Sequence, residues 1–175
     1  MNIFPCRENL TVEVHEYPFH QSLNESLMKD LSEIDYLNPE QLSYHTNIRG
    51  NQYSFCEHQK PKGIILIENW IANIIQSNVK SKLNVVFTTW VSKLDRGQET
   101  LPHNHMPYCT LAYVYFVNTP KGSSPLVFST SGRKIKAEVG KLVLFPSSAM
   151  HKVPKNRCDG RVTIASNISI TEILF

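Results

Sequence analysis

The sequence lacks a hydrophobic run long enough to cross a bilayer. Its longest uncharged apolar run is Gly63–Ile67, whereas a membrane-spanning helix needs about 20 apolar residues. The first residues also lack a basic segment followed by a long apolar one, so we expect no secretory signal. These absences predict a cytoplasmic protein that does not associate with a membrane.

Cysteine is scarce and carries no recognisable pattern. The chain has four cysteines, none in a C-x-x-C pair or at the spacing of a zinc knuckle: Cys6, Cys56, Cys109 and Cys158. Without a secretory signal, free thiols in a reducing cytosol are the default interpretation, ahead of a disulfide or a catalytic thiol.

The excess of positive over negative charge is also small. The formal net charge is +3, and the lysines and arginines are scattered without forming a stripe. This pattern disfavours a nucleic-acid partner and indicates an ordinary solvated surface. The chain has no repeat or low-complexity tract, and its 175 residues suffice for one domain, residues 1–175, with a core of its own.

The first 82 residues mix several kinds of pattern. We expect a strand, a helix, a loop and a second helix, at 11–17, 22–34, 38–62 and 64–76, respectively. Both helices carry apolar residues at helical spacing on one face, and Ser22 or Asn24 is expected to cap the first. These helices should therefore pack on a sheet.

From residue 83 to residue 175 the pattern changes to short β-rich runs separated by turn residues. The expected strands lie near 84–92, 109–118, 125–130, 133–138, 141–145 and 161–171. Closely spaced short strands indicate a β-sandwich or barrel. With the helices placed before the strands, the fold class is α+β, mainly β, with the helices covering one sheet.

The last predicted strand has two contrasting faces. One row is largely polar: Arg161, Thr163, Ala165, Asn167 and Ser169. The other row is apolar: Val162, Ile164, Ile168 and Ile170. Helices can cover the apolar row. The polar row then lines a wet binding cavity or lies in solvent at a sheet edge, and the strand alone does not decide between these.

Three of the seven histidines have a suggestive placement. His103 and His105 are two residues apart on extended chain, which points both imidazoles the same way, and His151 follows a later strand. Two ligands close in sequence and one remote is a common layout of a metal site. Without further evidence, the simpler explanation is that His103 and His105 are two exposed histidines of a loop and that His151 packs or forms a hydrogen bond. The remaining histidines, His15, His20, His45 and His58, show no such grouping.

The order of several segments from Trp90 onward resembles the iron(II)- and 2-oxoglutarate-dependent oxygenases. The nearest resemblance is to a small oxygenase family of bacteria and their phages that is related to the prolyl hydroxylases. The matching segments are Trp90 with Gly97, Pro102–His105, Leu111–Phe116, Ser124–Phe128, Gly140–Ser147, His151–Val153 and Arg161–Asn167. Together they cover about half of the chain.

This resemblance implies a double-stranded β-helix, or jelly roll, with Fe(II) as cofactor and 2-oxoglutarate as co-substrate, in a bacterium or a phage-infected host. It implies that His103 and His151 are iron ligands. Arg161 would bind the distal carboxylate of 2-oxoglutarate, since its planar fork meets a carboxylate with two hydrogen bonds, and Thr163 would bind the same group. Tyr113 and Asn167 are further candidates for contact with the co-substrate. Tyr113 equally suits core packing.

One position departs from the general pattern of two histidines and one carboxylate. The residue two after His103 is His105, so His105 is the expected third ligand of a three-histidine site. Glu99 or Asp95 could supply a carboxylate instead, although neither stands at a motif position. Whether such a site supports hydroxylation stays open at the level of sequence.

The expected activity is that of a dioxygenase acting on a small molecule or a peptide. Two alternatives remain: a cupin-like metal-binding jelly roll that does not use 2-oxoglutarate, and a metal-free interaction or structural domain. Arg161 favours the dioxygenase, because the first alternative has no need for a basic residue there. The sequence indicates neither the substrate nor the oligomeric state.

Overall fold

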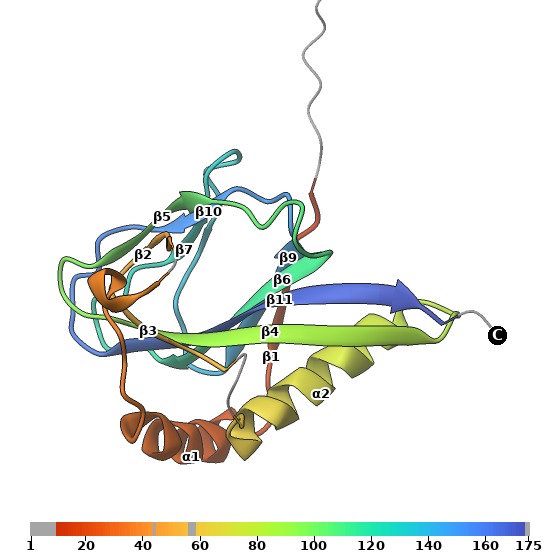
Figure 1. Ribbon diagram of the computed structural model, residues 1–175, viewed down its shortest axis with the longest axis horizontal. Coiled ribbons are helices and arrows are strands. Elements are labelled where there is room, and N and C mark those ends of the chain that lie inside the picture. Colours follow the sequence, from red (N-terminus) through yellow and green to blue (C-terminus); the bar gives the residue numbers. More distant parts are fainter. Residues whose placement is uncertain (1–9, 44, 56–58, 174–175) are drawn as a thin grey trace, which may run out of the picture.

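The computed structural model describes residues 10–43, 45–55 and 59–173 (Figure 1). Its helices are α1 (His20–Ser32), α2 (Lys62–Ser77) and the short 3₁₀ helix η1 (Pro39–Gln41). Its first strands are β1 (Glu13–Glu16), β2 (Ile48–Arg49), β3 (Asn51–Ser54), β4 (Leu83–Leu94), β5 (Glu99–His103) and β6 (Leu111–Asn118). The later ones are β7 (Leu126–Phe128), β8 (Lys134–Ile135), β9 (Lys141–Pro146), β10 (His151–Val153) and β11 (Arg161–Glu172).

The strands form two sheets that face each other. The large sheet has the order β1-β9-β6-β11-β4-β3, and the small sheet has the order β2-β5-β10-β7-β8. Every strand pairing in the described part of the chain is antiparallel. Both helices lie on the outer face of the large sheet, and the small sheet lies on its other side (Figure 1). The expected jelly roll with helices on one sheet is therefore confirmed.

The two faces of β11 behave as their residues predict. Val162, Ile164 and Ile168 are buried in the core between the large sheet and the helices, together with Leu27 and Ile71. The polar row starting at Arg161 and Thr163 faces the small sheet and borders a cavity. A wet cavity, rather than a solvent-exposed sheet edge, therefore explains the polar row of this strand.

Two local predictions are wrong. No side chain caps α1, which begins after Phe19; Asn24 is instead buried, accepts a hydrogen bond from the Tyr115 hydroxyl at 2.8 Å and donates one to the Val117 carbonyl oxygen at 3.0 Å. The segment 38–62, expected to be loop, contains η1, β2, β3 and the start of α2. Its two strands, β2 and β3, are short edge strands of the small and the large sheet. They are defined by pairing with a neighbouring strand rather than by a pattern in the sequence.

Two strands that matter for the site, β5 and β10, were not expected. Each has few residues and a proline within or just beyond it, Pro102 in β5 and Pro154 after β10, so neither shows a clear alternation. Of the cysteines, Cys109 and Cys158 are free thiols, as expected, whereas Cys6, Cys56 and also His58 lie outside the described residues. Among the described helices, none is long and apolar enough to span a membrane.

Packing of α2 on the sheet should contribute strongly to stability. Ile71 is fully buried, whereas Ile65 on the same helix is 43% exposed. Ile71→Ala is expected to lower the free energy of unfolding by about 2–5 kcal/mol, because it removes buried methyl groups and leaves a cavity. Ile65→Ala should change it by less than about 0.5 kcal/mol. Urea unfolding of both variants measures the difference, and equal effects would refute this placement of the helix.

Candidate metal centre

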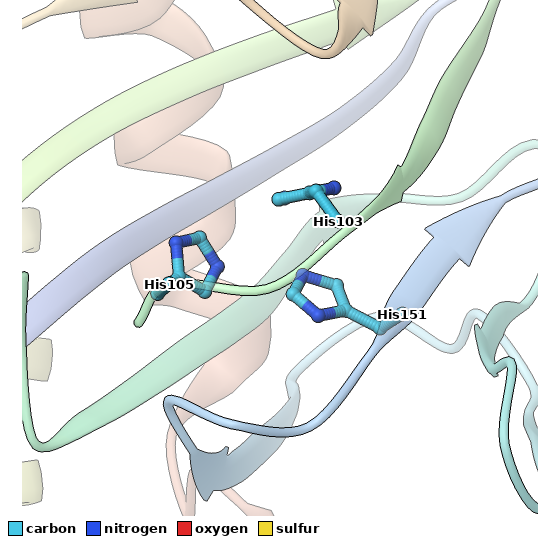
Figure 2. A group of neighbouring side chains, drawn as sticks. All are labelled: His103, His105 and His151. Carbon is cyan, nitrogen blue, oxygen red and sulfur yellow. The ribbon is translucent and has the colours of Figure 1, made fainter. Parts of the chain in front are cut away.

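Three histidines, two of them close in sequence and the third remote, meet between the two sheets. His103 ends β5, His151 begins β10, and the two residues are direct partners in the antiparallel ladder. His105 lies in the loop that follows β5. The ligand nitrogens of the three side chains lie within 4.8 Å of one another, and the ring centroids are 4.3–5.1 Å apart. Figure 2 shows the three side chains gathered at this point.

The backbone orients two of these rings. Nδ1 of His103 lies 2.8 Å from the carbonyl oxygen of Leu101, and Nδ1 of His151 lies 2.8 Å from that of Ala149. A carbonyl oxygen only accepts hydrogen bonds, so Nδ1 carries the proton in both rings and donates it. The lone pair of Nε2 is then free in each. Such an outer hydrogen bond is the usual partner of a histidine that binds a metal.

The loop carrying the third histidine is also fixed. The backbone N–H of His105 donates to the carbonyl oxygen of Ser147 at 2.8 Å, and the N–H of Tyr108 donates to the carbonyl oxygen of His105 at 2.9 Å. These bonds tie the loop to the end of β9 and hold His105 beside the other two rings. The His105 ring lies 6.1 Å, between centroids, from the ring of Trp90.

Burial keeps all three imidazoles neutral at physiological pH. Desolvation, assisted by the charge of the neighbouring His103, lowers the pKa of His105 to about 4 and that of His151 to about 3. Desolvation also lowers the pKa of His103, and its bond to Leu101 opposes this shift. A metal binds the neutral form of imidazole, so the cluster needs no deprotonation before it can coordinate an ion.

The same shifts predict an acid-sensitive fold in the metal-free protein. A histidine with a lowered pKa binds its proton less readily when folded than when unfolded, where its pKa is about 6.5. The free energy of unfolding should therefore fall as the pH drops below about 6.5, by up to about 1.4 kcal/mol per pH unit for each histidine. His151→Ala should reduce the slope. Urea unfolding at several pH values between about 4 and about 7 measures this slope.

A narrow cavity of about 40 Å³ adjoins the histidines. Its polar lining, besides the three imidazoles, is Ser92, Thr100, Arg161 and Thr163. Its apolar lining includes Trp90, Val114, Leu126 and Phe145. A larger hollow of about 500 Å³ lies elsewhere, beside Asn38 and Arg49, and contains none of the predicted site residues.

Arg161 is the most unusual group in this cavity, since it is only 1% exposed. Its Nε donates to the carbonyl oxygen of Ser124 at 3.2 Å, and its guanidinium lies 5.4 Å from the ring centre of Phe116. One terminal nitrogen is buried without a hydrogen-bond partner, and no carboxylate within the described residues forms an ion pair with it. Burial lowers the pKa of Arg161 to about 10, so it remains charged at neutral pH. A buried cation without a counter-ion is costly unless an anion binds there.

Thr163 lies beside Arg161 on the cavity face of β11, and its hydroxyl is 2.9 Å from that of Ser92. The structure thus brings Arg161 and Thr163 to the same cavity as the histidines. Ser92 and Thr100 were missed by the sequence reasoning. The alternation of β4, which places Trp90 and Ser92 on one face, was the available signal for Ser92.

The remaining candidates contact the cavity in part or not at all. Tyr113 borders the cavity, but its ring belongs to the core on the helix side, and its hydroxyl lies near Glu68 and Thr89. Tyr113 shares the strand face of Tyr115, which bonds to α1, so its ring serves the core packing that the sequence equally suggested. Contact of its hydroxyl with the co-substrate stays a prediction. The carboxyl group of Asp95 accepts the backbone N–H of Gly160 at 2.7 Å, outside the cavity.

Glu99 does not border the cavity either; it lies on β5 opposite Arg49 of β2. Asn167 lies on the cavity face of β11, beyond Ala165, and is not part of the cavity lining. Its Oδ1 is buried without a hydrogen-bond partner. Since Glu99 and Asp95 both lie outside the cavity, neither stands where the general pattern of two histidines and one carboxylate has its carboxylate.

Comparisons with known proteins find relatives in structure only. No family model matches the chain, and no curated protein matches its sequence. The viral collagen prolyl hydroxylase of Paramecium Bursaria Chlorella virus-1, solved with 2-oxoglutarate, has a TM-score of 0.70 at 14% identity, covering 90% of this chain and 94% of its own. A Pseudomonas putida prolyl-4-hydroxylase has a TM-score of 0.66 at 14% identity, covering 91% of both chains.

A third similar structure is HygX from Streptomyces hygroscopicus with nickel, 2-oxoglutarate and hygromycin B bound. Its TM-score is 0.68 at 12% identity, and the match covers 90% of this chain and 82% of HygX. Identities this low establish a common architecture rather than a common activity. The chain therefore has the double-stranded β-helix fold that is found in prolyl hydroxylases and in other proteins that bind 2-oxoglutarate.

Proposed function

We propose that this protein is an iron(II)- and 2-oxoglutarate-dependent dioxygenase. The observation that carries the proposal is the position of Arg161, a buried and charged guanidinium without a carboxylate partner among the described residues, in the same cavity as three converging histidines. A metal-only jelly roll would have no use for this cation. An anionic co-substrate held between metal and arginine explains both features.

The donor set fits a transition metal. Three neutral imidazoles offer Nε2 or Nδ1 lone pairs within 4.8 Å of one another, and two of the rings have their outer nitrogen fixed by a backbone carbonyl oxygen. Imidazole suits Fe, Zn, Cu and Ni, so the donors admit iron but do not exclude its competitors. His103, His105 and His151 would hold the ion, which in this class of enzyme supplies the oxidising chemistry.

The remaining residues would bind and orient the co-substrate. Arg161 can donate two parallel hydrogen bonds to a carboxylate, and the Thr163 hydroxyl can donate one more once its bond to Ser92 is exchanged. The apolar walls formed by Trp90, Val114 and Phe145 exclude water and strengthen these electrostatic contacts.

The substrate class is a small molecule or a peptide. Among the structural relatives, a prolyl hydroxylase from Trichoplax adhaerens was solved with a peptide fragment of hypoxia inducible factor, and HygX was solved with hygromycin B. A cytoplasmic location agrees with the free thiols of Cys109 and Cys158, which persist in a reducing compartment.

Anaerobic titration tests the proposal. The metal-free protein is given Fe(II) and then 2-oxoglutarate, and the visible spectrum is recorded after each addition. A weak charge-transfer band that requires both components is expected, followed by succinate formation when oxygen is admitted. A protein that binds iron but gives neither the band nor succinate would be the metal-only jelly roll, and one that binds neither would be a metal-free domain.

A further inference from the structure

The candidate centre has an unusual balance of charge. An imidazole that binds a metal does so in its neutral form, the cavity contains the buried side chain of Arg161, and no acidic side chain of the described residues borders the cavity. The carboxylates nearest in sequence to Arg161 and His103 have other partners: Asp159 accepts the backbone N–H of Arg96, Asp95 accepts that of Gly160, and Glu99 lies opposite Arg49. All negative charge at this site must therefore come from ligands.

A count of formal charges shows that 2-oxoglutarate alone does not suffice. A divalent metal and Arg161 together bring three positive charges, and the dianion of 2-oxoglutarate brings two negative ones. A site with an aspartate in place of His105 would then be neutral, whereas this one keeps one positive charge. Charge that is left uncompensated among apolar walls such as Trp90 and Phe145 is costly, and it attracts an anion from solution.

We propose that the primary substrate of this protein carries an anionic group, such as a carboxylate, which it places next to the metal centre, and that His105 creates this preference. The inference rests on the proposed function and adds the substrate class to it. A neutral substrate of the same shape would leave the surplus charge in place and would bind more weakly. The preference follows from the third ligand, because an acidic residue at this position would cancel it.

The test uses a pair of probes that have nearly the same shape and differ in charge, acetate and acetamide. The full-length protein is loaded with Co(II), whose visible bands report on its surroundings, and then with 2-oxoglutarate. Acetate and acetamide are titrated separately at constant ionic strength. His105→Asp is the test variant, and His45→Asp adds the same charge at an exposed histidine outside the cluster.

Acetate is expected to shift the Co(II) bands of the unmodified protein at concentrations at least about tenfold below those of acetamide. His105→Asp should remove this preference while it still binds Co(II), and His45→Asp should retain it. Equal responses to both probes, no response to either, or an unchanged preference in His105→Asp would each overturn the inference. A protein whose Co(II) bands never develop, or do not respond to 2-oxoglutarate, would instead refute the proposed function.

Discussion

Arg161→Ala is expected to reduce the affinity for 2-oxoglutarate by about thirtyfold to several thousandfold. The estimate follows from the roughly 2–5 kcal/mol lost when one partner of a buried charged hydrogen bond is removed, at about 1.4 kcal/mol per factor of ten. The guanidinium is 1% exposed and has a buried terminal nitrogen without a partner, so little solvent screening weakens the contact. Titration of the charge-transfer band with 2-oxoglutarate measures the effect.

Three controls separate this role from a structural one. Arg161→Ala should bind Fe(II) nearly as well as the unmodified protein, because the three histidines remain. Arg161→Lys should lie between the two proteins in 2-oxoglutarate affinity, since it keeps the charge and loses the planar fork. Arg157→Ala, at an exposed arginine nearby in the sequence, should have no effect. Succinate production by Arg161→Ala at the rate of the unmodified protein would show that the anchor is misassigned.

His151→Ala is expected to weaken metal binding by more than about 100-fold. Loss of a residue that merely supports a ligand already costs about 10–100-fold, and His151 is itself one of only three candidate ligands in the described part of the chain. Its Nδ1 is held by the Ala149 carbonyl oxygen, so the ring is already oriented toward the other two. Competition against a coloured chelator gives the metal affinity of each variant.

The comparison with His105→Ala decides between a three-histidine and a two-histidine site. If His105 is a ligand, its removal should weaken metal binding about as strongly as the removal of His151. An affinity that falls with His151→Ala but not with His105→Ala would leave His103 and His151 as the only ligands. His15→Ala serves as a control, because His15 pairs with Glu13 on β1, away from the cluster. Urea unfolding of each variant checks that the fold is intact.

The pattern of residues determined much of the architecture. Alternation of polar and apolar residues between Arg161 and Ile170, interrupted at Ala165 and Ser166, identified β11 and assigned Ile164 and Arg161 to opposite faces, because a strand turns successive side chains to opposite sides of the sheet. Helical spacing of apolar residues identified α1 and α2 in the same way. These signals are local and repeat several times, so a single sequence contains them in full.

Short strands could not be predicted from the sequence because they have too few residues for an alternation of polar and apolar side chains to be visible. Strands β5 and β10 are examples, and both exist through pairing with each other and with neighbours remote in sequence. The prediction that Ser22 or Asn24 caps α1 was wrong for a different reason. Asn24 has the chemistry of a cap, but its position on the inner face of the helix gave it a buried partner, Tyr115, instead.

The chemistry of imidazole and guanidinium belongs to the residue type, so the sequence alone named candidates for binding a metal and an anion. Its resemblance to the oxygenases selected the three histidines and Arg161 among them. Only the tertiary structure decided that they meet, because pairing of His151 with His103 across the small sheet depends on contacts between distant segments. It also decided that Tyr113 faces the helices and that Asp95 bonds to Gly160 rather than to the centre. The physical reason is that the direction of a side chain follows from strand register, and register is set by the packing of the whole sheet.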